Sequence, residues 1–185
     1  AADSLTAGTD PATPIWLGEK ILVPIERRGA TWIAEISSTA GSAKDRSARP
    51  RAVHGLVRPI PGTEDLLGTV TDPTHPPELF RWSPAGPPKQ ITHLYDAWLA
   101  KRDLVSPEKL SVKNPDGDDV EAWLYPPRGL EKGKKFPLVV YIHGGPQGYD
   151  GDYFDLDLEN QLFPARGWGV LRVNYRGSTA YGEKL

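Results

Sequence analysis

The chain has 185 residues, enough for one domain or two small ones. Lysine and arginine total 22 against 24 aspartate and glutamate, so the formal net charge of -2 gives no footprint for nucleic acid or an anionic membrane. The absence of cysteine excludes disulfides, thiolate metal sites and a cysteine nucleophile. No apolar run approaches the roughly 20 residues that span a bilayer, and the start at Ala1 to Ser4 lacks the regions of a signal peptide. We therefore expect a cytoplasmic protein that binds neither nucleic acid nor membrane.

Two further features of the composition stand out. Glycine and proline number 19 each, which predicts many turns. Methionine is absent, even at position 1. Such a chain is expected to be processed at its terminus or to be an internal piece of a longer polypeptide.

The first half of the chain predicts short strands joined by turns. Apolar runs at 20–26 and 31–36 flank Arg28-Gly29 and predict a hairpin. Pro24 indicates an edge position, because proline has no N–H to give to a neighbouring strand.

A second hairpin is predicted from runs at 66–71 and 78–82, joined by the turn-rich segment 72–77, with a short last strand at 89–92. It repeats the first hairpin after about 45 residues, a period typical of β-propeller blades of about four strands each. A single repeat also fits a small β-sandwich.

The polar residues of this half predict no site. The basic segment 45–52 is interpreted as a solvated linker, with contact to an acidic partner as the alternative. His54, His75 and His93 have spacings that suit no metal site, so we expect surface or structural roles for them.

The pattern changes at about residue 106. Runs at 109–112 and 120–127 flank the turn signal at 114–117 and predict a hairpin. The continuous apolar run at 136–143 is typical of a strand buried on both faces of a mostly parallel sheet.

A helix is predicted over 154–166, bent or ended by Pro164 and stopped at Gly167. The next buried strand, 168–175, completes a βαβ-like unit. So few strands do not make a stable α/β domain, so we expect the remaining strands to come from elsewhere.

His143, Gly144, Gly145 and Pro146 follow the first buried strand. Ligands of open α/β sheets bind at the carboxyl ends of strands, and a His-Gly-Gly stretch is how α/β-hydrolases supply one oxyanion N–H. The alternative is a plain turn beside a packed histidine. His143 is expected to shape the loop through hydrogen bonds, because the base of such enzymes follows the nucleophile in the chain.

A second loop, Asn174 to Gly182, follows the next strand at the same edge. Arg176 suits bidentate binding of a substrate carboxylate; the alternative is that Arg176 and Asn174 pin loops beside the site. Ser178 lacks a Gly-x-Ser-x-Gly frame and is not expected to be a nucleophile. The acidic stretch 150–159 is interpreted as a solvated helix start rather than a calcium site.

With both loops identified, the chain resembles the prolyl oligopeptidase family of serine peptidases, and in particular its acylaminoacyl-peptidase-like branch. The resemblance runs from about Ile15 to Leu185. Its most specific parts are Phe-Pro-Leu-Val-Val-Tyr-Ile-His-Gly-Gly-Pro at 136–146 and Asn-Tyr-Arg-Gly-Ser-Thr at 174–179. Leu-Val-Ser-Pro-Glu-Lys at 104–109 is similar to the junction between the propeller and the hydrolase of this family.

The resemblance implies a mixed fold. Residues 1–105 would be the C-terminal blades of a β-propeller, and residues 106–185 the first strands of an α/β-hydrolase peptidase domain. It implies that Gly145 gives an oxyanion N–H from a loop that it shares with Gly144 and His143, and it implies no cofactor or metal.

In this family the Ser-Asp-His triad lies downstream of these motifs, beyond Leu185. The chain is therefore expected to be a middle piece of such an enzyme and inactive alone. Its expected partners are a peptide substrate and the triad-bearing remainder of the same polypeptide or a companion chain. The oligomeric state, including a homo-oligomer, is left open.

The function expected of the parent enzyme is hydrolysis of short or N-acylated peptides. A carboxylesterase on the same fold is one alternative, because an oxyanion loop serves esters equally well. A non-catalytic propeller module that binds other proteins is the other.

Overall fold

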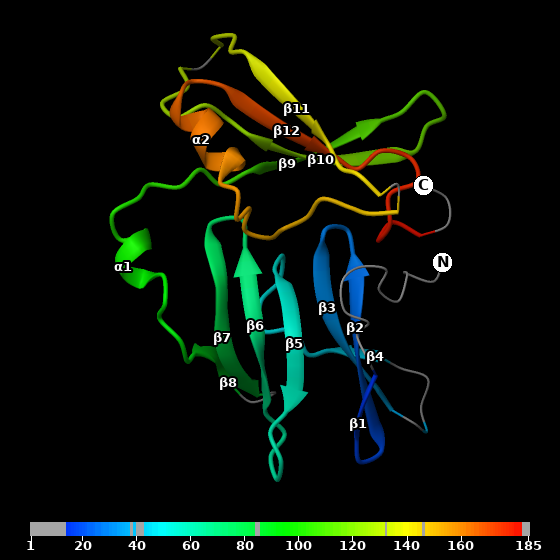
Figure 1. Ribbon diagram of the computed structural model, residues 1–185. Coiled ribbons are helices and arrows are strands. Elements are labelled where there is room, and N and C mark those ends of the chain that lie inside the picture. Colours follow the sequence, from blue (N-terminus) through cyan, green and yellow to red (C-terminus); the bar gives the residue numbers. More distant parts are fainter. Residues whose placement is uncertain are drawn as a thin grey trace.

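The computed structural model describes residues 14–37, 39, 43–83, 86–131, 133–145 and 147–182. Within these ranges the chain forms three four-stranded sheets and two short helices (Figure 1). Neither helix of this described part is long and apolar enough to cross a bilayer. The start at Ala1 to Ser4 and the position of Pro146 lie outside the described residues.

The first sheet is an antiparallel meander of β1 (Ile15–Leu17), β2 (Lys20–Arg27), β3 (Ala30–Ser37) and β4 (Ala43–Asp45). The predicted first hairpin is confirmed by the pairing of β2 with β3. Its turn has φ of 52° at Arg28 and 77° at Gly29, as a two-residue turn matched to strand twist requires. Pro24 lies where β1 no longer pairs with β2, which agrees with the edge position that the sequence indicates.

The second sheet is a meander of β5 (Val53–Pro59), β6 (Leu66–Asp72), β7 (His75–Ser83) and β8 (Gly86–Gln90). The predicted second hairpin is confirmed by the pairing of β6 with β7. The prediction of the last strand is wrong by a few residues, since β8 covers 86–90 rather than 89–92. The sequence prediction missed β1, β4 and β5.

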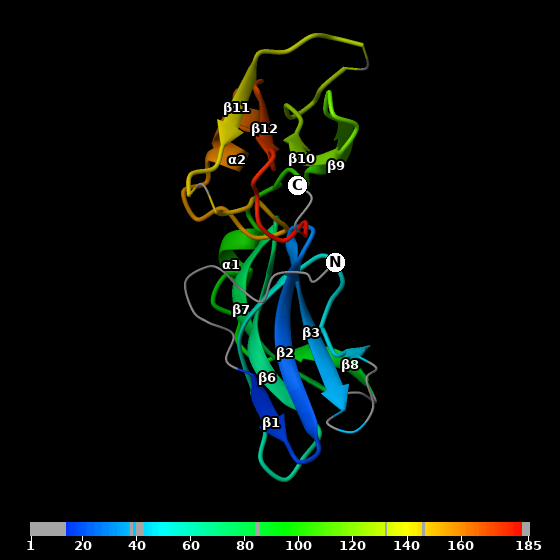
Figure 2. The same ribbon diagram turned by 90° about the vertical axis from the view of Figure 1, so that its right-hand side faces the viewer.

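The first two sheets, whose strands β2, β3 and β6 overlap in the view of Figure 2, share one hydrophobic core. Leu22 and Leu66, one from each of the two repeated apolar runs, are both fully buried, so each meander directs side chains of its run into this shared core. The buried core residues are Leu22, Ile33, Ala52, Val57, Leu66, Val70, Phe80 and Trp82.

The third sheet has the order β11-β12-β10-β9, from β9 (Glu108–Lys113), β10 (Asp119–Tyr125), β11 (Leu138–Ile142) and β12 (Gly169–Val173). The predicted hairpin is confirmed as β9 with β10. The predicted βαβ unit is confirmed as well, because α2 (Glu159–Ala165) connects β11 to its parallel neighbour β12.

One expectation for the third sheet is wrong: β11 is not buried on both faces. The exposed fraction is 43% for Leu138, 53% for Val140 and 68% for Ile142. The reason is topological, because β11 is an edge strand that pairs with β12 alone within the described residues. The apolar run was read correctly as a strand, but a strand is buried only when other elements cover it.

The predicted helix over 154–166 is also wrong at its start, because α2 begins at Glu159. Leu158 has a left-handed φ of 61°, which interrupts helical geometry just before it. Phe154 instead packs edge-on against Trp98, a residue of the unpredicted helix α1 (Asp96–Leu99). The Phe154 N–H donates to Thr71 Oγ1 at 3.2 Å. Residues 154–158 therefore connect the third sheet to the second.

The interpretation of the basic segment 45–52 as a solvated linker is wrong at Arg46, which is buried. This side chain is only 8% exposed and forms an ion pair with Glu35. Its second guanidinium nitrogen donates to the Glu64 carbonyl at 2.8 Å, and its own carbonyl accepts from Trp82 Nε1 at 2.7 Å. The segment therefore packs between the first two sheets.

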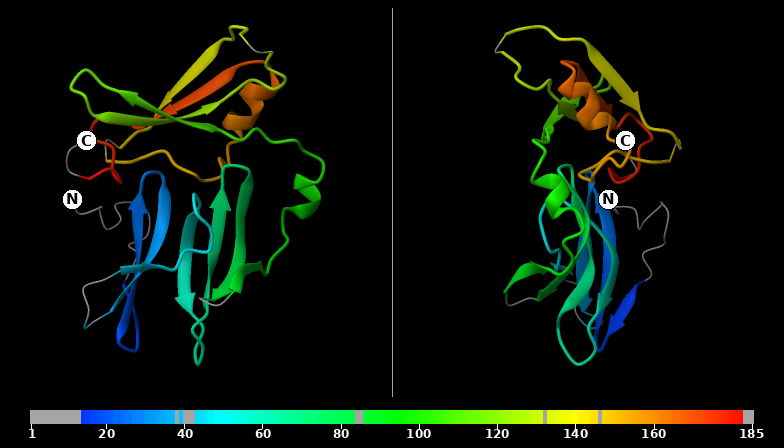
Figure 3. Two further views of the ribbon diagram at one scale, coloured as in Figure 1. Left: turned by 180° about the vertical axis from the view of Figure 1, so that it is seen from behind. Right: turned by 60° about the vertical axis from the view of Figure 1, so that its left-hand side comes forward.

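The β2–β3 turn lies against the loops that flank the third sheet, as the left view in Figure 3 shows. The Asp152 N–H donates to the Gly29 carbonyl at 2.6 Å, and the Arg28 N–H donates to the Ala180 carbonyl at 2.9 Å. A Cβ on Gly29 would lie 2.6 Å from the Trp123 ring. A Cβ on Gly151 would lie 2.9 Å from the Gly29 carbonyl carbon. Two backbones meet here without room for side chains.

We predict that Gly151→Ala destabilises the chain by about 1–3 kcal/mol, because its new methyl group meets rigid backbone rather than a movable side chain. Chemical denaturation measures the change. The control is Gly86→Ala, where the added Cβ meets only Ser83 Oγ at 4.0 Å. Equal stability of the two variants would contradict the close approach.

A second prediction concerns His54, which is buried and structural. Its Nε2 accepts from the Ala48 N–H at 3.0 Å and its Nδ1 donates to the Thr31 carbonyl at 2.8 Å, so the ring is neutral. Burial lowers the pKa of His54 below its ordinary 6.5. Its stabilising effect is thus present above the unfolded-state pKa and is lost as the pH falls through the folded-state pKa.

We therefore expect the melting temperature to fall between about pH 7.5 and about pH 5. His54→Gln removes the titrating ring and should reduce this fall, whatever its effect at neutral pH. An identical acid dependence in the variant would show that other groups cause it.

Candidate functional site

The loop after β11 starts with His143 and turns at Gly145, at the carboxyl end of the strand. Gly145 has φ of 143°, a backbone conformation that favours glycine. A Cβ at this position would lie 2.7 Å from the Gln147 nitrogen. The loop therefore needs glycine for its shape.

The backbone at Gly144 and Gly145 is exposed. Within the part of the chain that the structure describes, no group accepts a hydrogen bond from either N–H. Backbone donors that are fixed in place and uncommitted can stabilise negative charge on a substrate oxygen. This geometry suits the oxyanion role expected of Gly145, which stays a prediction.

His143 is held by three contacts of its ring and one of its carbonyl. Its Nδ1 lies 3.0 Å from the Gly144 carbonyl and its Nε2 2.8 Å from Ser178 Oγ. A carbonyl only accepts, so in the neutral ring Nδ1 carries the proton and Nε2 accepts from the Ser178 hydroxyl. The ring also stacks on Tyr175 at 4.5 Å, and the Tyr175 hydroxyl donates to the His143 carbonyl at 2.8 Å.

These contacts connect the two loops at the carboxyl edge of the sheet. The Thr179 N–H donates to the Gly148 carbonyl at 2.9 Å, which adds a backbone link. Ser178 is 4% exposed, so its hydroxyl has little access to a substrate despite its hydrogen bond to a histidine. The arrangement favours a loop-shaping role for His143 and gives Ser178 no sign of a nucleophile's exposure.

The side chain of Arg176 forms ion pairs within the chain. Its guanidinium lies 2.6 Å from Asp116 and 3.0 Å from Asp118, both in the turn between β9 and β10. The structure thus favours the alternative in which Arg176 pins loops. Substrate binding by Arg176 stays a prediction without a contact that supports it.

Asn174 is fully buried and joins the two loops from below. Its side-chain oxygen accepts from the Asp150 N–H at 2.7 Å, and its amide nitrogen donates to the Asp150 carbonyl at 2.9 Å. The same nitrogen lies 2.8 Å from the Tyr181 hydroxyl. Asn174 therefore fixes where the chain leaves the Gly145 loop.

The acidic stretch 150–159 is not a solvated helix start, because Asp150 and Asp152 are each 1% exposed. Asp152 accepts from Trp123 Nε1 at 2.8 Å and pairs with Arg51 at 3.3 Å. Asp150 pairs with Arg172 at 2.9 Å. Buried carboxylates need such partners. The described residues contain no group of three or more histidine, aspartate or glutamate side chains that could hold a metal ion.

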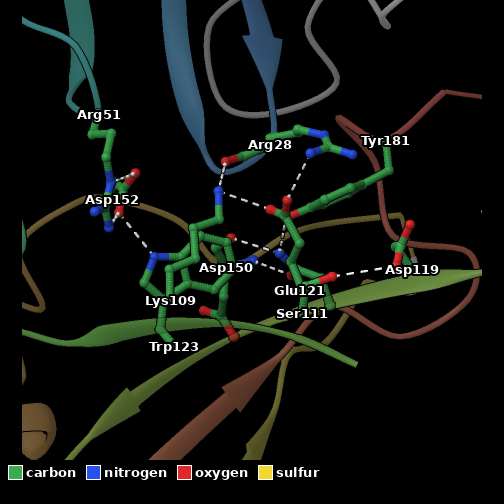
Figure 4. Close-up of polar contacts among 11 residues, drawn as sticks. Arg28, Arg51, Lys109, Ser111, Asp119, Glu121, Trp123, Asp150, Asp152 and Tyr181 are labelled. Atoms are coloured by element: carbon green, nitrogen blue, oxygen red, sulfur yellow. Dashed lines mark hydrogen bonds and ion pairs between the residues drawn. The ribbon is translucent and has the colours of Figure 1, made fainter. Parts of the chain in front are cut away.

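Glu121 is the centre of a polar cluster between the β2–β3 turn and the third sheet (Figure 4). Its side chain is 7% exposed and lies 2.8 Å from Lys109 and 3.2 Å from Arg28. The Tyr181 hydroxyl donates to it at 3.0 Å. Burial, followed by the charge of Glu121, raises the pKa of Tyr181, which keeps this hydroxyl protonated as a donor.

Sequence reasoning missed this cluster. Its members come from the β2–β3 turn, from β9 and β10 and from the C-terminal loop, and no spacing in the sequence connects them. The Arg28-Gly29 turn signal predicted the hairpin but not what the hairpin touches.

We predict that Glu121→Gln destabilises the chain by about 1–3 kcal/mol, because two cations lose the buried charge that holds them. Chemical denaturation measures it. The control is Glu131→Gln, since the Glu131–Lys134 pair is 70% and 68% exposed and should change stability by less than about 0.5 kcal/mol. A Glu121 variant as stable as the control would contradict a structural role for the cluster.

The chain has relatives that are named peptidases. It is 30% identical over 199 residues to the uncharacterized peptidase YuxL of Bacillus subtilis, a match that covers 99% of this chain and 27% of that protein. It is 34% identical over 83 residues to dipeptidyl-peptidase 4 of Giardia intestinalis, covering 44% of this chain and 11% of that protein. No protein-family model matches the chain.

Solved structures share the fold. Acylaminoacyl peptidase of Pyrococcus horikoshii superimposes with a TM-score of 0.77 at 25% identity, over 92% of this chain and 26% of that one. An acylaminoacyl peptidase in complex with Z-Gly-Gly-Phe-chloromethyl ketone gives the same TM-score of 0.77, identity of 25% and coverage of 92% and 26%. A puromycin-hydrolyzing peptidase of Mycobacterium tuberculosis gives 0.66 at 25% identity, over 91% and 26%.

The chain thus spans about a quarter of the length of YuxL and of these solved structures. Its similarity to them extends across nearly all of its own residues, including both loops at the carboxyl edge of the third sheet. In sequence and fold the chain is therefore similar to these peptidases, which supports its resemblance to the prolyl oligopeptidase family.

Proposed function

We propose that this chain is part of a serine peptidase that hydrolyses short or N-acylated peptides. The observation that carries the proposal is Gly145, an exposed residue at the carboxyl end of β11 whose φ of 143° favours glycine and whose N–H has no acceptor within the described residues. That is where ligands of open α/β sheets bind. The peptidase relatives, one of them a structure with a peptide chloromethyl ketone, support a peptide as the substrate.

In the proposed reaction a serine attacks the peptide carbonyl and the oxygen gains negative charge. The Gly145 N–H donates one hydrogen bond to this oxygen, and the N–H of the residue after the nucleophile donates the other. Gly144 keeps the approach free of a side chain. His143, Tyr175 and Ser178 hold the loop in position through the contacts described above.

The proposed division of the chain is residues 1–105 as blades of a propeller and residues 106–185 as the start of the hydrolase domain. Two four-stranded antiparallel meanders followed by a sheet that begins at Glu108 support it. The unpaired edge and exposed apolar side chains of β11 suit further strands. We propose that those strands, with the nucleophile, acid and base, come from the remainder of the polypeptide or from a companion chain.

The first test is labelling with a fluorophosphonate, which modifies activated serines. The 185-residue chain alone should take no label, at Ser178 or elsewhere, whereas a polypeptide that continues to the downstream serine should be labelled. Label on Ser178 would contradict the proposed site. No label on the longer polypeptide would instead favour a binding module.

In that longer polypeptide, Gly145→Ala should lower kcat by about 10²–10³, because the loop must move and misplace its N–H. Gly86→Ala is again the matched control and should retain kcat. Comparison of acyl-peptides with p-nitrophenyl esters separates the peptidase from the alternative carboxylesterase. A cytoplasmic location and a homo-oligomer stay predictions that these assays do not address.

A further inference from the structure

A cavity of about 410 Å³ lies at the junction, apart from the Gly145 loop. It is formed by the β2–β3 turn, the segment 45–52 and β9. Five of the side chains that line it are cationic, and only two are carboxylates, Asp45 and Asp152. The sign of the charge is the reverse of that of the whole chain, which is -2. The cationic residues are Arg27, Arg28, Arg49, Arg51 and Lys109.

Two of these cations, Arg28 and Arg51, form ion pairs with buried carboxylates and still remain exposed to solvent. Arg51 pairs with buried Asp152 at 3.3 Å, and Arg28 pairs with buried Glu121 at 3.2 Å. The two arginine side chains are nevertheless 59% and 61% exposed. Figure 4 shows Arg51, Lys109 and Arg28 in sequence along the junction. A planar guanidinium held in this way has donors left for a second carboxylate.

The backbone at two of these positions is unusual. Arg28 has φ of 52° and Arg51 has φ of 53°. Glycine or asparagine adopts this left-handed conformation at lower energy than arginine. Both arginines line the same cavity from positions with this uncommon backbone conformation, Arg28 in the β2–β3 turn and Arg51 just before β5.

The remaining walls suit an organic ligand rather than a small ion. Trp32 is 41% exposed, and Arg27 lies over its ring at 5.0 Å. A second cavity of about 250 Å³ shares Arg27, Trp32 and Asp45 with the first and adds apolar side chains. Cavities of about 300–1,000 Å³ accept ligands of the size of a short peptide.

We propose that this cavity binds the carboxylate of a peptide, either its C-terminus or an acidic side chain. The identification of the ligand as a peptide rests on the proposed function. Asp45 at the rim can accept from a peptide N–H, which inorganic phosphate lacks. The Arg28 N–H bonds to the Ala180 carbonyl, two residues from the Ser178 that holds His143, so the cavity and the Gly145 loop share one support.

The test is isothermal titration calorimetry of the chain with acetyl-Ala-Ala-Glu-Glu. The matched probes are acetyl-Ala-Ala-Gln-Gln, the C-terminal amide of each peptide, and inorganic phosphate. The acidic peptide should bind at least about tenfold more tightly than the Gln-Gln amide, with a preference that shrinks as salt increases. Replacing only the two glutamates by glutamine tests the acidic side chains, and amidating only the C-terminus tests the C-terminal carboxylate.

Variants locate the binding. Arg28→Gln and Arg49→Gln should each lower the affinity for the acidic peptide by about tenfold, because each substitution removes a charged hydrogen-bond donor. Arg128→Gln is the control, since it removes the same charge from a 44% exposed arginine outside the cavity. Thermal unfolding of every variant shows whether the fold is retained, and Arg28→Lys tests the need for a planar group.

Equal affinity for the acidic peptide and the Gln-Gln C-terminal amide, which has no carboxylate, would overturn the proposal. So would an equal loss in the Arg128 variant, or phosphate that binds as tightly as the acidic peptide. Binding with the expected selectivity, together with no hydrolysis by the longer polypeptide, would overturn the proposed function alone. Hydrolysis by a chain with no preference for the acidic probe would overturn only this inference.

Discussion

The backbones of Gly29 and Gly151 lie so close together that a methyl group on Gly151 would meet the Gly29 backbone, and one on Gly29 would meet the Trp123 ring. This approach lets the Asp152 N–H reach the Gly29 carbonyl and places the Asp152 carboxylate under Trp123 and Arg51. The β2–β3 turn is thereby fixed against the chain that leaves the Gly145 loop. The first two sheets and the third are thus joined by backbone hydrogen bonds at this turn.

Charge at the junction follows from the same contact. Bringing the turn against the third sheet buries Glu121 and Asp152, and each buried carboxylate holds basic side chains around it. Arg27, Arg28, Arg49, Arg51 and Lys109 all line the cavity beside Trp32. On the other side of the turn, Ala180 and the buried Asn174 fix the two loops that carry Gly145 and His143. One support thus positions a neutral donor site and a cationic cavity.

The third sheet shows the opposite balance at its outer edge. Leu138, Val140 and Ile142 are apolar residues of β11, which has no neighbour on one side among the described strands. Burial of such side chains is the main favourable term in folding, so this edge is where further structure would contribute most. The small buried core of the third sheet, Trp123, Tyr125 and Val170, agrees with this asymmetry.

The sequence by itself determined the hairpins, the βαβ unit and the Gly145 loop, because turn residues and strand periodicity act over a few neighbouring positions. It also supplied the family, through two motifs whose residue types are specific. Only the tertiary structure decided which residues are buried: Arg46, Asp150 and Asp152 look like solvated charges in sequence, and β11 looks like a buried strand. The partners of these residues are distant in the chain, as with Arg51 and Asp152, which are 101 residues apart. No local pattern encodes such pairs, since they arise when separate sheets pack.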